Sequence, residues 1–268
     1  METVCLATHA MGCRWEFVLA GADLAHLRAA GEEAIESVES AHERLSAFAA
    51  DSVVSRINAS AGKWAERVDA ELLGLVLVCE SVRTASVGAF DVCVGRVMEA
   101  AGYRRSGTEL GAESARVGRI EVDRAASTIG LVDARSSIDL GGVGKGFGLD
   151  LAVESLREAG VGSAFVHAGT SSVAAVGHRP DGSAWRVALP WGGEVELVDT
   201  ALSVSGTEVQ GAHVVDPRTG EPAADRGPIA LMGASAALCD AWSTACFVDE
   251  SCVEKIPAGY VCLTGSRE

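Results

Sequence analysis

The sequence predicts an α+β fold in which a mixed, largely antiparallel sheet is flanked by helices. Helical hydrophobic periods occur early in the chain and again near its end. Between them lies a run of consecutive strand-like segments, without regular alternation of strand and helix. That order favours an antiparallel arrangement over βαβ winding. No internal repeat and no Pro-, Gly- or Ser-rich linker divides the chain, so we expect one domain over residues 1–268.

Four segments carry the spacing of a helix. Residues 21–48 place apolar side chains three or four positions apart with glutamates between them, which predicts an amphipathic helix. Residues 70–86 predict a second, more apolar helix, with Gly88 as its C-cap. Residues 144–159 predict a third helix that ends before a glycine, and residues 234–247 predict the last one.

The strand-like segments fill the middle and the end of the chain. Residues 116–139 read as short strands with a turn at residues 123–127. Further strands are expected at residues 163–169, 172–177, 184–189, 193–204 and 259–264.

Charge and cysteine content exclude several classes of protein. The chain has 37 acidic and 22 basic residues, a net charge of −15. Binding to nucleic acid or to anionic lipid needs a basic surface, so neither partner is expected. The eight cysteines form no CxxC pair, which favours a reducing compartment. With neither a signal sequence nor a span of about 20 apolar residues, the chain reads as cytoplasmic, and an exported precursor that has lost its leader is the alternative.

The segment at residues 138–160 predicts an anion site. A strand ends at Leu140, a glycine-rich turn follows, and Lys145 stands at the start of the next helix. Glycines allow close approach of a phosphate, and the free N–H groups of a helix start can bind it. The P-loop pattern fails because Gly146 follows the lysine. The alternative is an ordinary strand-to-helix connection with a solvated lysine.

Asp240 and Thr244 are candidates for a metal site. They lie four residues apart on the last predicted helix, so their oxygens share one face. A carboxylate and a hydroxyl suit a hard cation such as Mg²⁺. Taken alone, this pair fits a polar helix stripe without metal at least as well.

Two further segments can contribute polar groups. In residues 211–222, His213 and Asp216 are close enough in sequence to share a site, beside a turn at Asp216–Gly220. In residues 87–95, the turn Ala89–Phe90–Asp91 offers a ring and a carboxylate to a planar heterocycle.

Together these segments form a recognisable series. MGCRWEF, LSAFAADSVVSRIN, GAFDVCVG, DLGGVGKGFGLD, HVVDPRTGEP and DAWSTA occur in this order between Met11 and about Val248. The series resembles the ApbE family of FAD:protein FMN transferases. The chain departs from the usual family pattern at Gly169–Ser172, where Gly-Gly-Asp/Asn is common, and at Val204–Gly206, where Thr-Ser-Gly is common.

The resemblance implies an activity and a set of site residues. Such enzymes use Mg²⁺ to transfer the FMN part of FAD to a Thr or Ser hydroxyl of a target flavoprotein, with release of AMP. The resemblance implies FAD contacts from Met11, Phe48, Ala89, Phe90, Asp91, Asp139, Lys145 and Val214. It implies metal contacts from Gly142, Asp240, Ser243 and Thr244. His213 and Asp216 are the candidate general bases.

Two other functions fit the same residues. An FAD pyrophosphatase would use water as the acceptor and give FMN and AMP. A flavin-binding protein would keep the pocket without catalysing transfer. The Asp240–Thr244 pair and Lys145 favour an enzyme over a carrier.

Overall fold

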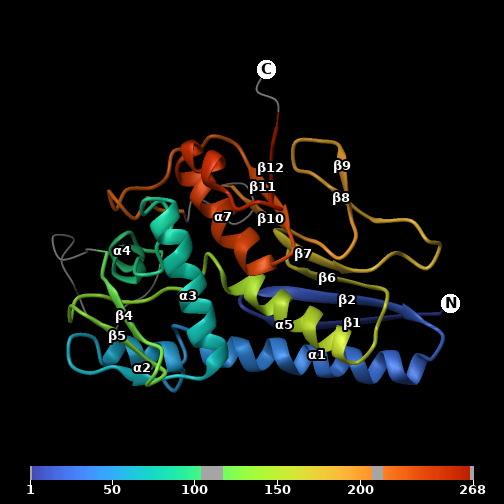
Figure 1. The fold of residues 1–268 in the computed structure, drawn as a ribbon, viewed down its shortest axis with the longest axis horizontal. Helices are drawn as coiled ribbons and strands as arrows, with labels where there is room; N and C mark the ends of the chain where they lie inside the picture. Colours follow the sequence, from blue (N-terminus) through green and yellow to red (C-terminus); the bar gives the residue numbers. More distant parts are fainter. Residues whose placement is uncertain (1, 104–116, 207–213, 266–268) are drawn as a thin grey trace.

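A seven-stranded antiparallel sheet forms the centre of the computed structural model, which describes residues 2–103, 117–206 and 214–265. The strand order is β1-β2-β6-β7-β10-β11-β12, and each neighbouring pair in it runs antiparallel. The predicted fold class is therefore confirmed (Figure 1). The strands of this sheet are β1 (Glu2–Ala10), β2 (Cys13–Gly21), β6 (Ala164–Ala168), β7 (Ser172–Val176), β10 (Ala201–Ser205), β11 (Ile229–Gly233) and β12 (Val261–Thr264).

Two smaller sheets accompany it. The first has the order β3-β5-β4, with β3 at Glu66–Arg67, β5 at Thr128–Leu131 and β4 at Ile120–Asp123. The second is the hairpin of β8 (Trp185–Ala188) and β9 (Glu194–Leu197).

The helices of the described residues match the four predicted segments and add shorter ones. They are α1 (Leu24–Leu45), α2 (Val53–Ala59), α3 (Ala70–Ala85), α4 (Gly95–Ala100), α5 (Gly144–Glu158), α7 (Ala236–Val248) and the 3₁₀ helix η2 (Glu250–Lys255). None of the helices in the described ranges is long and apolar enough to cross a membrane.

Helices α1, α5 and α7 pack on one face of the large sheet, and the β8–β9 hairpin packs on the other (Figure 1). The alternation of side chains along β2 buries Trp15, Phe17 and Leu19 completely on the helical side. On the opposite side, the Phe165 ring of β6 stacks on Trp185 of the hairpin with their centroids 5.3 Å apart. Each face of the sheet thus has an apolar cover.

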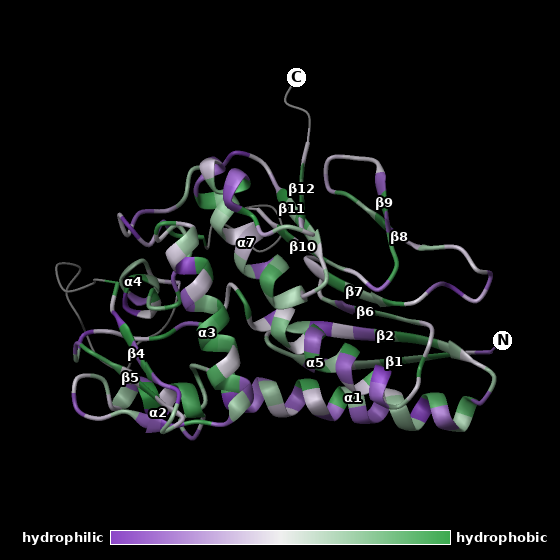
Figure 2. Cartoon of the chain, viewed as in Figure 1, coloured by the Kyte–Doolittle hydropathy of each residue, from purple (hydrophilic) through white to green (hydrophobic). Residues whose placement is uncertain are grey.

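The long helix α1 follows from its sequence. Asp23 caps its first turn by accepting hydrogen bonds from the N–H groups of Ala25 and His26. Hydrophilic and hydrophobic residues alternate along the helix in Figure 2, and the buried positions form one stripe. A Cβ at Gly31 would lie 2.4 Å from the Leu6 Cδ1, so this glycine lets the helix approach β1 closely.

The segment at residues 193–204 was predicted as one strand and forms two. Asp199 has a φ of 48° and breaks the extended backbone between β9 and β10. Its carboxylate accepts hydrogen bonds from the Gly177 N–H at 3.1 Å and from Arg157 at 2.9 Å. After the break, β9 pairs with β8 in the hairpin and β10 pairs with β7 and β11 in the large sheet. This division depends on the pairing partners, which the hydrophobic pattern alone does not reveal.

Several elements were not predicted, and the β1–β2 hairpin is the largest of them. Its turn has positive φ at both Met11 (51°) and Gly12 (75°), the geometry of a two-residue hairpin turn. The alternation of Trp15, Phe17 and Leu19 could have revealed β2. The strand β11 and the short helices α2 and α4 were also missed.

Candidate functional site

A pocket of about 380 Å³ lies where the start of α5, one face of α7, the end of β10 and the turn at residues 89–92 meet. Ten of the residues singled out in the sequence line it. They are Phe48, Ala89, Phe90, Asp91, Asp139, Gly142, Lys145, Val214, Asp240 and Thr244. Segments that lie up to about two hundred residues apart in the sequence are thus brought to one cavity.

Three predicted site residues lie outside the pocket lining, and a fourth cannot be placed. Met11 occupies the β1–β2 turn, where its N–H donates to His42 Nδ1 at 3.1 Å. Ser243 is fully buried next to the lining residue Thr244. Asp216 lies in the loop before β11, between the lining residues Val215 and Pro217. His213 lies outside the described residues.

Asp240 is 5% exposed and is held from three directions. Its Oδ2 accepts from the N–H of Gly146 at 2.9 Å. Its Oδ1 accepts from the Ser203 hydroxyl of β10 at 2.6 Å and from the Ser172 hydroxyl of β7 at 3.4 Å. A carboxylate has about four lone-pair positions, so one side of the group remains able to contact a ligand in the pocket.

Thr244 brings a hydroxyl to the same wall. Its Oγ1 donates to the carbonyl oxygen of Asp240 at 3.0 Å and lies 3.3 Å from the Ser205 Oγ. A Cβ at Gly142 would be 3.6 Å from this Oγ1, so the backbone of the glycine-rich turn reaches the threonine. Ser243 instead hydrogen bonds to Ser205 at 2.8 Å and to the Asp240 carbonyl at 3.0 Å.

The oxygen atoms at this wall are of the kind that a hard cation prefers. The described part of the chain contains no cluster of three or more His, Cys, Asp or Glu side chains that could hold a metal. The oxygen ligands that the pocket offers are instead the Asp240 carboxylate, the hydroxyls of Thr244 and Ser205, and backbone carbonyls of the glycine-rich turn. Oxygen donors of this kind suit Mg²⁺, which usually takes only one or two carboxylates from protein.

Lys145 supplies positive charge at the start of α5. It lines the pocket, and no salt bridge joins it to another residue within the described ranges. The N-cap Val143 makes no side-chain cap to α5. The neighbouring Asp139 turns its carboxylate back to accept from the Gly141 N–H at 2.8 Å, which shapes the glycine-rich turn.

The turn at Ala89–Asp91 forms another part of the pocket lining. The Phe90 N–H donates to the Ser86 hydroxyl at 3.2 Å, and the Cys93 N–H donates to Asp91 Oδ1 at 2.8 Å. Burial raises the pKa of Asp91 to about 6, although the Cys93 N–H and the Arg83 charge oppose this. At neutral pH a fraction of this carboxyl is protonated, so it can donate as well as accept a hydrogen bond.

The turn is preceded by an unusual backbone conformation. Gly88 was predicted as the C-cap of α3, but the C-cap is Ser86 and the next residue, Val87, has a φ of 56°. The N–H groups of Val87 and Gly88 donate back to Thr84 and Arg83, at 3.3 and 2.9 Å. These two bonds are those of a Schellman motif, in which Val87 occupies the position usually taken by glycine.

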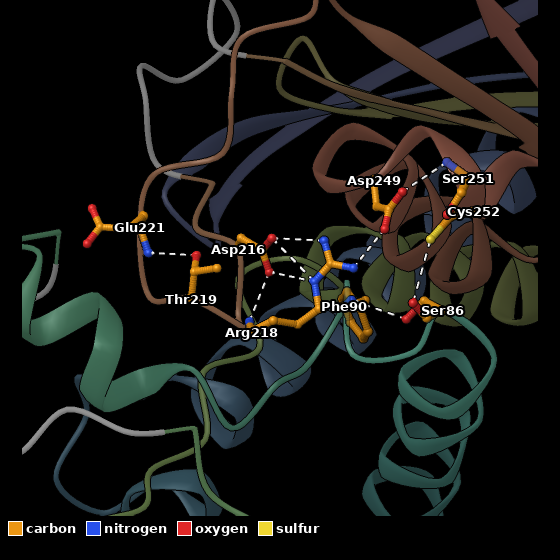
Figure 3. Close-up of polar contacts among 9 residues, drawn as sticks. All are labelled: Ser86, Phe90, Asp216, Arg218, Thr219, Glu221, Asp249, Ser251 and Cys252. Carbon is orange, nitrogen blue, oxygen red and sulfur yellow. Dashed lines mark hydrogen bonds and ion pairs between the residues drawn. The ribbon is translucent and has the colours of Figure 1, made fainter.

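Arg218 joins the loop after residue 213 to the end of α7. Its guanidinium binds Asp216 through Nε and Nη2 at 2.9 and 2.8 Å, and Asp249 through Nη1 at 2.7 Å (Figure 3). Burial favours a higher pKa for Asp216, but the hydrogen bonds from Arg218 outweigh it and lower the pKa. A carboxylate held in this way is a weak base, and in the structure Asp216 is bound to Arg218 of its own loop.

Some pocket residues were not assigned from the sequence. Ser171, Val204, Ser205 and Gly206 form a wall at the start of β7 and the end of β10, and Met98 and Tyr103 also line the pocket. Ser172 and Ser203, which face each other across β7 and β10, hold Asp240 from below. The departures from the family pattern at Gly169–Ser172 and Val204–Gly206 pointed to this wall without giving its role.

A comparison with protein families decides the wider identity. The family model described as "ApbE family" matches residues 11–255. The chain belongs to the ApbE family. The predicted resemblance is thereby confirmed over nearly the whole sequence.

Individual ApbE proteins agree with this assignment. A relative from Vibrio cholerae serotype O1, named FAD:protein FMN transferase, is 24% identical over 213 residues, which is 70% of this chain. A Rhodobacter capsulatus relative of the same name is 30% identical over 207 residues, or 66% of this chain. The chain spans only 64% and 38% of these two relatives' lengths. The solved ApbE protein from Thermotoga maritima matches the fold with a TM-score of 0.85 at 24% identity, covering 97% of this chain and 93% of that one.

Proposed function

We propose that this ApbE-family protein transfers the FMN moiety of FAD to a Thr or Ser hydroxyl of a flavoprotein, with release of AMP. The observation that carries the proposal is the meeting of Lys145, Asp240 and Thr244 with the Ala89–Asp91 turn in one pocket. An anion-binding helix start and a hard-oxygen donor set therefore lie beside a wall suited to a planar ring. The acceptor flavoprotein, Mg²⁺ and a cytoplasmic location belong to this proposal, and the eight free cysteines favour that location.

The chain's own residues divide the binding of FAD between them. Phe48 lines the pocket and is 76% exposed, so its ring offers apolar area to a planar group. Asp91 can hydrogen bond to a heterocycle edge in either protonation state. Lys145 and the start of α5 offer positive charge to the pyrophosphate.

The proposed reaction is a phosphoryl transfer. The acceptor hydroxyl oxygen bonds to the phosphorus of the FMN half, and the bond from that phosphorus to the AMP oxygen breaks. The hydroxyl proton passes to a base, for which His213 is our candidate because Asp216 is bound by Arg218. Gly142, Asp240 and Thr244 would hold Mg²⁺, which when bound supplies charge neutralisation at the pyrophosphate.

The test uses FAD, Mg²⁺ and a flavoprotein domain with an exposed threonine. We expect mass spectrometry to show a gain of one FMN moiety on that domain, together with one AMP for each transfer. Thr244→Val, which removes the hydroxyl at constant shape, is expected to lower kcat/KM by roughly 10- to 100-fold. Thr244→Ser keeps the hydroxyl and is the matched control.

Other outcomes would overturn the proposal. AMP and free FMN without a mass gain on the domain would show a pyrophosphatase. Tight FAD binding with neither product would show a flavin-binding protein. Full activity in Thr244→Val would remove this residue from the metal site.

A further inference from the structure

The starts of α5 and α7 cap each other. Helices α5 and α7 pack together (Figure 1), and both contribute residues to the pocket lining. Asp150, in the second turn of α5, accepts from the N–H groups of Ala236 and Ala237 at 2.6 and 3.0 Å and from the Ser235 hydroxyl at 2.7 Å. A carboxylate from one helix thus binds the free donors at the start of the other.

The arrangement is reciprocal. Asp240, in the second turn of α7, accepts from the N–H of Gly146 in the first turn of α5. The spacing is the same in both helices. In α5, Asp150 follows Gly146, whose N–H binds Asp240, by four residues. In α7, Asp240 follows Ala236, whose N–H binds Asp150, by four residues. The two hydrogen-bonded links and the two intervening helix turns form a closed ring.

The contact between the helices is very close inside this ring. A Cβ at Gly146 would lie 2.2 Å from the carbonyl oxygen of Ala236 and 2.8 Å from the Cα of Ala237. Only a glycine lets the two backbones approach this far. The relative position of the helices is therefore fixed by backbone contact and by the two carboxylates together.

This ring determines the spacing of the proposed cation site. Gly142 and Lys145 belong to the α5 side of the pocket, while Asp240 and Thr244 belong to the α7 side. Any movement between the helices changes the distance between the two halves. One link of the ring, Asp240, is a proposed ligand. Asp150 lies outside the pocket lining, and its carboxylate accepts hydrogen bonds from Ser235 and from the first two N–H groups of α7.

We propose that Asp150 is a positioning residue, which holds α7 against α5 so that the two halves of the cation site keep their spacing. The inference rests on the proposed function, because it concerns the metal that this function requires. Groups that orient metal ligands commonly change metal affinity by about 10- to 100-fold when they are removed. Partial burial raises the pKa of Asp150, while the three donors oppose that rise.

The experiment measures metal binding directly and uses Mn²⁺, which prefers the same oxygen ligands as Mg²⁺ and is visible by electron paramagnetic resonance. The full chain is saturated with FAD and titrated with Mn²⁺, as wild type, Asp150→Asn and Asp23→Asn. Asp150→Asn keeps the volume but sets an amide against three donors, so we expect Mn²⁺ affinity to fall by about tenfold or more. The Mg²⁺ concentration for half-maximal turnover should rise by a similar factor, with most of kcat recovered at saturating Mg²⁺.

Asp23→Asn is the matched control, since it makes the same change at the cap of α1, far from the pocket. It should leave Mn²⁺ binding unchanged. A folded Asp150→Asn protein with wild-type Mn²⁺ affinity would overturn the inference. If Asp150→Asn does not fold, Ser235→Ala removes one of the three donors together with the hydrogen bond that the Ser235 hydroxyl accepts from the Leu238 N–H. Wild-type Mn²⁺ affinity in that variant overturns the inference equally. Absence of Mn²⁺ binding in the wild type would instead contradict the metal in the proposed function.

Discussion

Asp240 lines the pocket, and its carboxylate also accepts hydrogen bonds from strands β7 and β10 and from helix α5. A substitution there leaves the Gly146 N–H buried without its acceptor, which costs about 1–3 kcal/mol. Loss of activity in an Asp240 variant therefore mixes a structural effect with any effect on metal binding. Thr244, whose hydroxyl can be removed without exposing other buried donors of the sheet, separates the two more cleanly.

The raised pKa of Asp91 predicts a pH-dependent stability. The folded pKa is about 6 and lies above the ordinary value of 3.8, so the folded state binds the proton more tightly. Stability from this group is fully present below about pH 4 and is lost as pH rises toward 6, by at most roughly 3 kcal/mol. Glu80, Arg83 and the Cys93 N–H are the groups that act on it.

Asp91→Asn should abolish this contribution and make the protein more stable than the wild type at pH 7. The measurement is the free energy of unfolding in urea at pH 4.5 and at pH 7. A difference between variant and wild type that is the same at both values would contradict the assignment. Asp181→Asn, in an exposed loop, controls for the loss of one negative charge.

Val87 carries a backbone strain that can be measured. A β-branched residue at a φ of 56° is strongly disfavoured, and this side chain is 68% exposed, so it gains little from packing. Val87→Gly should stabilise the protein by about 1 kcal/mol, read as a rise in the urea midpoint. Val132→Gly, at another exposed valine without positive φ, should not stabilise it.

At the scale of elements, the pocket walls depend on a few long-range links. Arg218 connects the loop at residues 214–222 to Asp249 at the end of α7 (Figure 3). Its Cγ would be 3.5 Å from a Cβ at Gly88. The Cys252 thiol of η2 donates to the Ser86 carbonyl at 3.7 Å, which ties the end of α3 to the same region. The loop at residues 214–222, the end of α3 and the region after α7 are thus linked to one another by these contacts.

Arg218→Ala should loosen the loop and raise the KM for FAD by roughly tenfold, with a smaller change in kcat. The KM of Arg218→Lys for FAD should lie between those of the wild type and Arg218→Ala, because an ammonium group cannot bridge two carboxylates in the same planar geometry. Arg186→Ala, on the exposed β8–β9 hairpin, is the control. An FAD KM within twofold of wild type in Arg218→Ala would contradict this role.

The same link should persist in mild acid. The hydrogen bond from Arg218 lowers the pKa of Asp249 to about 2, and the pKa of Asp216 is lowered as well. Both carboxylates therefore stay ionised above about pH 4, and the stability they contribute is lost only as pH falls toward their folded values.

At the scale of the whole molecule, one apolar cluster connects most elements. It runs from β1 and β2 through α1, α3 and α5 to α7, while the smaller cluster under the β8–β9 hairpin lies on the other face of the sheet. The net charge of −15 is compatible with an anionic substrate, because Lys145 and the start of α5 provide local positive charge.

The continuity of this core predicts cooperative unfolding. Urea transitions followed by far-UV circular dichroism and by tryptophan fluorescence should coincide, with Trp15 and Trp242 reporting from the main cluster. Trp64→Phe removes the signal of an exposed tryptophan and serves as the control. Two separated transitions would contradict the single domain that the sequence predicts.

Much of the fold could be predicted because its information is local. The apolar periods of α1 and α3, the glycine-rich turn before α5 and the polar pair on α7 are properties of neighbouring residues. The sequence by itself therefore determined the four longer helices, the fold class and, through the motif series, the family. Short strands such as β11 and the split at Asp199 depend on pairing partners and could not be read in this way.

Only the tertiary structure decided what the polar side chains touch. Asp240 meets a backbone N–H 94 residues away, Asp150 meets the start of a helix more than 80 residues away, and Asp216 is bound by an arginine that a distant aspartate also holds. A carboxylate has the same chemistry in any sequence context. Its role as ligand, cap or ion-pair partner depends on which donors the packed helices and strands bring within about 3 Å.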